Sequence, residues 1–125
     1  MDTNELEKLA QLTKQLLKLN EEALNRYQTL PEDYIPDFYK DIKPFSDRIY
    51  ERAAEWKTLA LQWIQNEKIR YLYPNQIENT FENLQTVSIQ AFQKKSYAAH
   101  FYSMIKSNDY ILQTMLHYLE KQSNR

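Results

Sequence analysis

Residues 6–30 read LEKLAQLTKQLLKLNEEALNRYQTL, and this stretch decides the fold. Its apolar residues recur every three or four positions, which places them on one face of an α-helix. They are Leu6, Leu9, Leu12, Leu16, Leu19, Ala23, Tyr27 and Leu30. Asp2 and Glu5 form a capping-box pattern at the start. Pro31 ends the helix, because proline disfavours helical geometry at the preceding residue. We therefore expect a helix over about 3–29.

The same spacing continues in a second segment, which we expect to be helical over about 37–67. Its apolar positions are Phe38, Ile42, Phe45, Ile49, Ala53, Trp56, Ala60 and Trp63. The register passes Pro44 without a break in phase, which favours one long helix kinked at that proline. The alternative places Pro44 in the first turn of a new helix.

Two further segments predict helices over about 75–94 and 97–121. The third helix would bury Ile77, Phe81, Leu84, Ser88, Ala91 and Phe92, and the fourth would bury Ala98, Phe101, Ile105, Asn108, Leu112, Met115 and Leu119. Asn75 and Glu78 form a capping pair for the third. Four amphipathic segments with short connections pack most simply as an all-α, up-down-up-down antiparallel four-helix bundle. We expect residues 1–125 to form this single domain.

Composition removes several classes of function. The chain has no glycine, so it has no glycine-rich phosphate loop, and no cysteine, so it has no thiolate metal site. A net charge of −1 gives no overall attraction to nucleic acid or an anionic membrane, and we expect neither as a partner. No stretch approaches the ~20 apolar residues of a membrane span, and the polar start lacks the features of a secretory signal. We expect a cytoplasmic protein.

Five short motifs resemble the YppE-like proteins of Gram-positive bacteria. They are Arg26-Tyr27-Gln28, Asp37-Phe38, Ile42-Lys43-Pro44, Ala53-Ala54-Glu55-Trp56 and Gln76-Ile77-Glu78. The resemblance covers most of the chain, from about Arg26 to the fourth predicted helix, whereas the first helix matches only in pattern. It implies a four-helix bundle, and it carries over no catalytic or binding residue.

No constellation of residues predicts a reaction. His100 and His117 lie 17 positions apart on one predicted helix, roughly 25 Å along its axis, so they cannot share a metal ion. Neither follows a glutamate at the Glu-x-x-His spacing of carboxylate-bridged metal sites. We therefore predict no catalytic, cofactor-binding or metal-binding residue, and we favour a protein that is not an enzyme. Asn108 and Ser88 interrupt their apolar stripes, which predicts either a polar pocket or, as we favour, a buried hydrogen bond that fixes register.

Ten tyrosines are the most unusual feature of the sequence. In the expected topology the first and third connections meet at one end, which collects the candidate partner-binding residues Tyr34, Tyr39, Tyr97, His100 and Tyr102. Tyrosine is enriched in protein interfaces, although rings can also simply close the end of a bundle. The leading hypothesis is a non-catalytic module that binds an unidentified protein partner.

Two other hypotheses stay open. One is a small-molecule- or metal-dependent activity in the bundle core. The other is a structural homodimer with its seam on Leu12, Leu16, Leu19 and Ala23. We expect a monomer or a weak homodimer.

Overall fold

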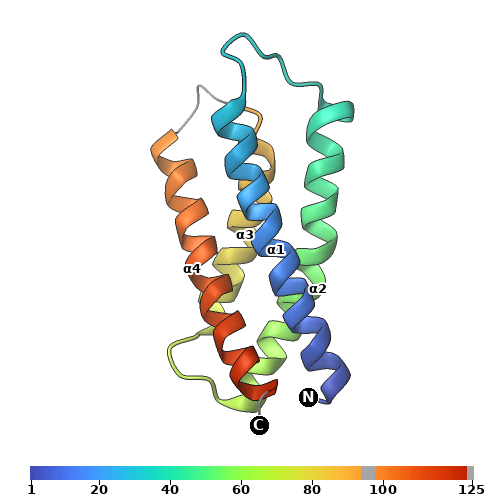
Figure 1. Cartoon of the computed structure of the whole chain (residues 1–125), viewed down its shortest axis with the longest axis vertical. Helices are drawn as coiled ribbons and strands as arrows, with labels where there is room; N and C mark the ends of the chain where they lie inside the picture. The colour runs from blue at the N-terminus through green and yellow to red at the C-terminus, as the bar shows by residue number, and fades with distance from the viewer. Residues whose placement is uncertain (94–97, 124–125) are drawn as a thin grey trace.

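The computed structural model describes residues 1–93 and 98–123, which fold into four α-helices and one π-helical turn without a strand (Figure 1). The elements in chain order are α1 (Thr3–Thr29), the π-helix η1 (Phe38–Ile42), α2 (Lys43–Glu67), α3 (Pro74–Gln90) and α4 (Ala98–Ser123). The bounds of α1 agree with those expected from its spacing.

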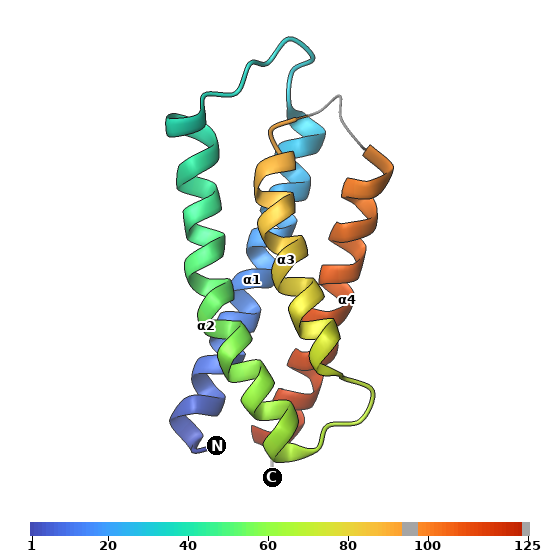
Figure 2. The same cartoon turned by 180° about the vertical axis from the view of Figure 1, so that it is seen from behind.

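Successive helices run antiparallel, as Figures 1 and 2 show from opposite sides. α1 packs against α2 and α4, and α3 packs against the same two helices from the other side of the bundle. The connection over 30–37 lies at the same end as the last turn of α3 and the first turn of α4. The connection over 68–73 lies at the opposite end, beside both termini. The predicted up-down-up-down bundle is confirmed.

The predicted apolar faces meet in one continuous core. Nearly all of the predicted stripe is buried, and the largest fully buried side chains include Trp56, Trp63, Phe101, Leu9, Leu16, Ile49, Ile77, Leu84, Leu112 and Met115. Burial of this apolar surface provides the main stabilisation of such a bundle, about 25 cal/mol for each Å² removed from water. Four predicted positions differ: Phe38 and Ala98 are exposed, and Leu6 and Phe81 are only partly buried.

The starts of two helices show where sequence patterns specify a cap. In α1 the Glu5 N–H donates to Asp2 Oδ1 (2.8 Å) and the Asp2 N–H donates to Glu5 Oε1 (3.2 Å), so the predicted capping box is confirmed. In α3 the helix begins at Pro74, and the predicted Asn75 cap is wrong. Proline suits the first helical position because it has no N–H to satisfy there, which leaves capping to Tyr73.

The segment before α2 is a π-helical turn. Pro44 has no N–H, and its ring crowds the carbonyl four residues earlier. The N–H groups of Ile42 and Lys43 therefore donate to carbonyls five residues back, at Asp37 and Phe38. Helical backbone does continue from η1 into α2 past Pro44, but the π-helical turn shifts the phase so that Phe38 leaves the predicted stripe. α2 itself begins at Lys43 and has Pro44 in its first turn, as in the alternative prediction.

Two turns differ from the simplest expectation. α3 ends at Gln90 instead of near residue 94, because Phe92 and Gln93 donate to carbonyls only three residues back and tighten the chain. In the second connection Lys68 and Tyr71 have φ values of 50° and 68°. A chain without glycine must use other residues for these left-handed positions, at some steric cost.

Candidate functional site

Two carboxylates accept hydrogen bonds across the first connection and brace it. Asp37 Oδ1 accepts from the N–H groups of Tyr39 and Lys40, both at 2.9 Å, and so caps η1. Asp41 Oδ2 accepts from the Asp37 N–H (3.0 Å) and from the Tyr34 hydroxyl through a short hydrogen bond. Tyr34 thereby ties the preceding loop to the π-helical turn.

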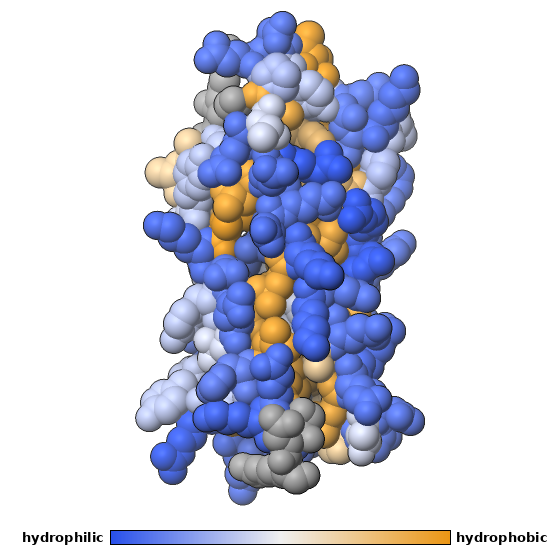
Figure 3. Space-filling model, viewed as in Figure 1, coloured by the Kyte–Doolittle hydropathy of each residue, from blue (hydrophilic) through white to orange (hydrophobic). Residues whose placement is uncertain are grey.

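Three apolar side chains project from this braced segment, and we call them the apolar tip. Ile35 is 87% exposed, Phe38 is 54% exposed and Tyr39 is 77% exposed. The Phe38 and Tyr39 rings meet edge to face, with centroids 5.2 Å apart. Figure 3 shows apolar surface at this end of the molecule among hydrophilic side chains. Single exposed apolar residues are common, but three on one short, constrained segment are typical of a contact surface.

The contact between Tyr34 and Asp41 raises the pKa of the tyrosine and lowers the pKa of the carboxyl group. Burial, followed by the hydrogen bond to Asp41, raises the pKa of Tyr34 to about 12. The hydrogen bond from Tyr34, with help from the Asp37 backbone, lowers the pKa of Asp41 below its ordinary value. The contact therefore stabilises the segment at pH values between the pKa of Asp41 and the pKa of Tyr34. It weakens as acid protonates Asp41 and as alkali deprotonates Tyr34.

A tyrosine titration tests this contact. The absorbance difference between the wild type and a Tyr34→Phe variant reports Tyr34 alone, and we expect its midpoint near pH 12. An Asp41→Asn variant should move that midpoint toward the ordinary tyrosine value of about 10, because the nearby negative charge is gone. A midpoint near 10 in the folded wild type, with folding checked by circular dichroism, would contradict the contact.

The predicted partner-binding residues differ in their exposure and in the elements that carry them. Tyr39 is exposed on the tip, whereas Tyr34 is half-buried and engaged with Asp41. Tyr102 is 37% exposed and packs edge to face on Tyr27, with centroids 5.6 Å apart. His100 is exposed in the first turn of α4, and Tyr97 lies outside the described residues. Only Tyr34 and Tyr39 belong to the same short segment as the tip.

Sequence reasoning missed two residues of the tip. Phe38 fits the apolar spacing of the second helix and was therefore assigned to the core, but the π-helical turn rotates it outward. Ile35 stands outside every helical stripe, between Pro31 and Pro36. An apolar residue in a proline-flanked connection is a signal that could have identified it.

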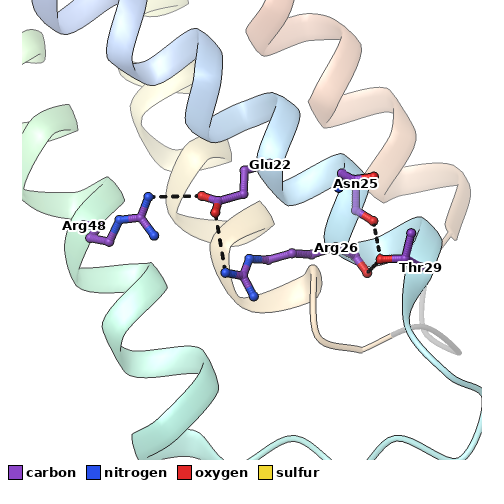
Figure 4. A network of polar contacts seen from close by, with 5 residues as sticks. All are labelled: Glu22, Asn25, Arg26, Thr29 and Arg48. Carbon is purple, nitrogen blue, oxygen red and sulfur yellow. Dashed lines mark hydrogen bonds and ion pairs between the residues drawn. The ribbon is translucent and has the colours of Figure 1, made fainter.

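A second polar cluster lies between α1 and α2 (Figure 4). Glu22 accepts from both Arg26 Nη2 (3.5 Å) and Arg48 Nη2 (3.2 Å), so one carboxylate pairs with two guanidinium groups. The Arg26 guanidinium lies 5.0 Å from the centroid of Phe45 and 5.5 Å from that of Phe92. These cation–π contacts fix Arg26 over the aromatic rings, and the rings and Glu22 together position it.

Four polar side chains between the helices hydrogen-bond in two separate pairs. Asn108 Nδ2 donates to Asn20 Oδ1 (3.1 Å), and Asn20 Nδ2 donates to the Ile105 carbonyl (3.0 Å). Ser88 instead contacts Ser46 on α2 (3.2 Å). Asn108 and Ser88 therefore do not meet in a shared polar pocket, and the predicted buried hydrogen bond is present at Asn108.

Among the described residues we find neither a metal site nor an exposed seam on α1. In the described part of the chain, no three histidine or carboxylate side chains gather closely enough to hold a metal ion. The seam proposed for a homodimer, Leu12, Leu16, Leu19 and Ala23, is buried in the core and cannot pair with a second copy. No helix within these residues is both long and apolar enough to cross a bilayer.

Comparison with known proteins assigns the chain to a family. A model described as a bacterial domain of unknown function, DUF1798, matches residues 13–119. The uncharacterized protein YppE of Bacillus subtilis is 25% identical over 118 residues, which are 94% of this chain and 96% of that protein. Its crystal structure has a TM-score of 0.87 and covers 95% of this chain and 98% of its own. A Listeria innocua crystal structure of a protein of unknown function is 31% identical, with a TM-score of 0.91, and covers 97% of this chain and 98% of that one. The chain therefore belongs to the DUF1798 family, and it shares its four-helix bundle with YppE and with the Listeria protein.

Proposed function

We propose that this protein is a non-catalytic interaction module that binds another protein through the apolar tip, as part of a cytoplasmic complex. The exposure of Ile35, Phe38 and Tyr39 on one braced segment is the observation that carries the proposal. Leaving three large apolar side chains in water forgoes the free energy that burial in the core would give. A protein partner that covers them recovers it.

Preorganisation strengthens the proposal. The Asp37 cap and the Tyr34–Asp41 contact already fix the backbone that presents the tip. Binding then loses less conformational freedom than it would through a floppy loop, so more of the contact energy appears as affinity. Aromatic side chains such as Phe38 and Tyr39 are common anchors in protein interfaces.

The tip is too small to form a complete interface alone. A standard interface uses about 20–30 residues on each side, so the partner must also touch the surrounding surface. His100 and Tyr102, at the same end of the bundle, supply polar and aromatic groups for this rim. Tyr97 stays a prediction within the same surface.

Matched double variants test the proposal. Ile35→Ser with Tyr39→Ser removes two large side chains from the tip, and Tyr71→Ser with Tyr110→Ser removes two large side chains, 70% and 67% exposed, from the opposite connection and from α4. Both should change the free energy of unfolding by less than about 0.5 kcal/mol per substitution, because the side chains are exposed. Each protein is immobilised and used to capture partners from a lysate of its source, with quantitative mass spectrometry.

The tip variant should lose at least about tenfold of a specifically captured protein that the control variant retains, since truncation of an interface anchor typically costs more than 1 kcal/mol. Equal capture by both double variants would contradict the proposal. So would an equal loss from both, because that loss would not depend on the tip.

A further inference from the structure

A charged groove between α1 and α2 has no role in the proposed tip interface. Its volume is about 710 Å³, and it extends along α1 from Gln15 to Gln28, with Arg48 and Arg52 on the α2 side. These residues are separate from Ile35, Phe38 and Tyr39, so the two surfaces can be altered independently.

Positive charge exceeds negative charge in this groove. Lys18, Arg48 and Arg52 line it together with Glu21 and Glu22, which leaves one excess positive charge among the five. Arg26 does not line the groove but pairs with Glu22 beside it, which offsets part of the negative charge of that carboxylate. The whole chain carries a net charge of −1, so this groove has the opposite sign to the molecule.

The cations of the groove have N–H donors that remain available to bind an anion. Glu22 already serves both Arg26 and Arg48, although each guanidinium has five N–H donors. Neither Lys18 nor Arg52 pairs with a carboxylate within residues 1–93 and 98–123. Within the described part of the chain, Arg52 donates to the Arg48 carbonyl (3.0 Å) and to no other group, which leaves its other donors for a ligand. Arg26 is held over the Phe45 and Phe92 rings. Glu22 lies between Arg26 and Arg48 and pairs with both, so it also positions the head of Arg48 (Figure 4).

The shape of the groove selects the size of the ligand. From Gln15 to Gln28 the α-helical rise gives a length of about 20 Å. That length fits about six residues of extended chain at roughly 3.3 Å each, whereas a free phosphate or a single carboxylate would fill a small part of it. Side-chain amides of Gln15 and Gln28 are available for hydrogen bonds to a peptide backbone.

We propose that this groove binds an extended, acidic segment of a protein partner, with Lys18, Arg48 and Arg52 as the recognising cations. Carboxylates spaced along a peptide can reach the cations while avoiding Glu21 and Glu22. The side-chain amides of Gln15 and Gln28 also match the N–H and C=O groups of a peptide backbone, whereas the sugar-phosphate backbone of a nucleic acid has no N–H group to donate.

The test measures binding of a fluorescein-labelled hexaglutamate peptide by fluorescence anisotropy at low and at physiological ionic strength. Labelled hexalysine and a thymidine hexanucleotide serve as the other probes. Lys18→Glu with Arg52→Glu reverses two charges of the groove, and both side chains lie outside the core. Arg70→Glu with Lys121→Glu makes the same change in net charge at exposed positions elsewhere. Circular dichroism confirms that both variants are folded.

Hexaglutamate should bind saturably, more weakly at higher salt, and hexalysine should not bind. The groove variant should lose about tenfold in affinity and the control variant less than about twofold, since a charge must lie close to its partner to matter at physiological salt. Three results would overturn the proposal: no saturable binding of hexaglutamate at low ionic strength, an equal loss in both variants, or a thymidine hexanucleotide that binds as tightly as the peptide. The tip variant should bind hexaglutamate normally, so failure of one surface does not imply failure of the other.

Discussion

Replacement of Trp56 with alanine is expected to lower the free energy of unfolding by about 3–5 kcal/mol. The indole lies on α2, is fully buried, and belongs to the single core that all four helices share. Its removal leaves a large cavity, because the surrounding helices relax only in part. Urea denaturation followed by circular dichroism measures the change, and a loss below about 1 kcal/mol would mean that this face of α2 is not packed as described.

Replacement of each buried tryptophan with phenylalanine tests the contacts of its indole N–H. Trp63 Nε1 donates to Gln122 Oε1 (2.8 Å), whereas Trp56 Nε1 is buried with no acceptor among the described residues. Trp63→Phe therefore loses a hydrogen bond, typically about 0.5–1.5 kcal/mol, in addition to ring volume. Trp56→Phe loses only volume and removes an unsatisfied donor. Trp63→Phe should be the more destabilising of the two, and the opposite order would contradict these contacts.

The second large effect is expected at the buried asparagine pair. Asn20→Ala leaves the Asn108 amide without its acceptor in the interior, where an unsatisfied polar group costs about 1–3 kcal/mol. Once Asn20 is gone, a further Asn108→Ala change removes a group that has already lost its partner. The double variant should therefore be destabilised by less than the sum of the two single variants, as a double-mutant cycle in urea would show.

Additive effects in that cycle would indicate that the two amides do not interact. The pair joins α1 to α4, and Asn20 Nδ2 also donates to the Ile105 carbonyl on α4. These hydrogen bonds fix the register of the two helices. A buried polar contact of this kind limits the alternative registers that an all-leucine seam would permit. Thr13 is also buried on α1, but its hydroxyl donates to the Leu9 carbonyl and takes no part in this contact.

The helices of this protein could be predicted from sequence because each depends on a local period. In α1 the leucine spacing, the Asp2–Glu5 capping box and the stop at Pro31 specify both ends independently of the rest of the chain. The order and direction of the four helices then follow from short connections. Asn108 was identified as a polar interruption in its stripe, but its partner Asn20 was not, because only tertiary packing brings α1 and α4 together.

The candidate site was only partly predictable, for a reason that involves Pro44. A π-helical turn changes the angular position of each residue before the proline, so the 3.6-residue period that places Phe45 in the core does not place Phe38 there. The interaction of Tyr34 with Asp41 joins a loop to that turn, and no spacing rule contains it. Tyr39 was found because tyrosines in connections were considered together, whereas Ile35 was found only from its exposure.

Site-specific photo-crosslinking tests whether the apolar tip binds a protein partner. Benzoylphenylalanine replaces Tyr39 on the tip in one protein and Tyr110 on α4 in another, and both positions are largely exposed, at 77% and 67%. Each protein is irradiated in living cells of its source, and the adducts are identified by mass spectrometry. We expect a discrete protein adduct from position 39 that is absent from position 110. The same adduct from both positions, or an adduct from position 110 alone, would contradict this expectation.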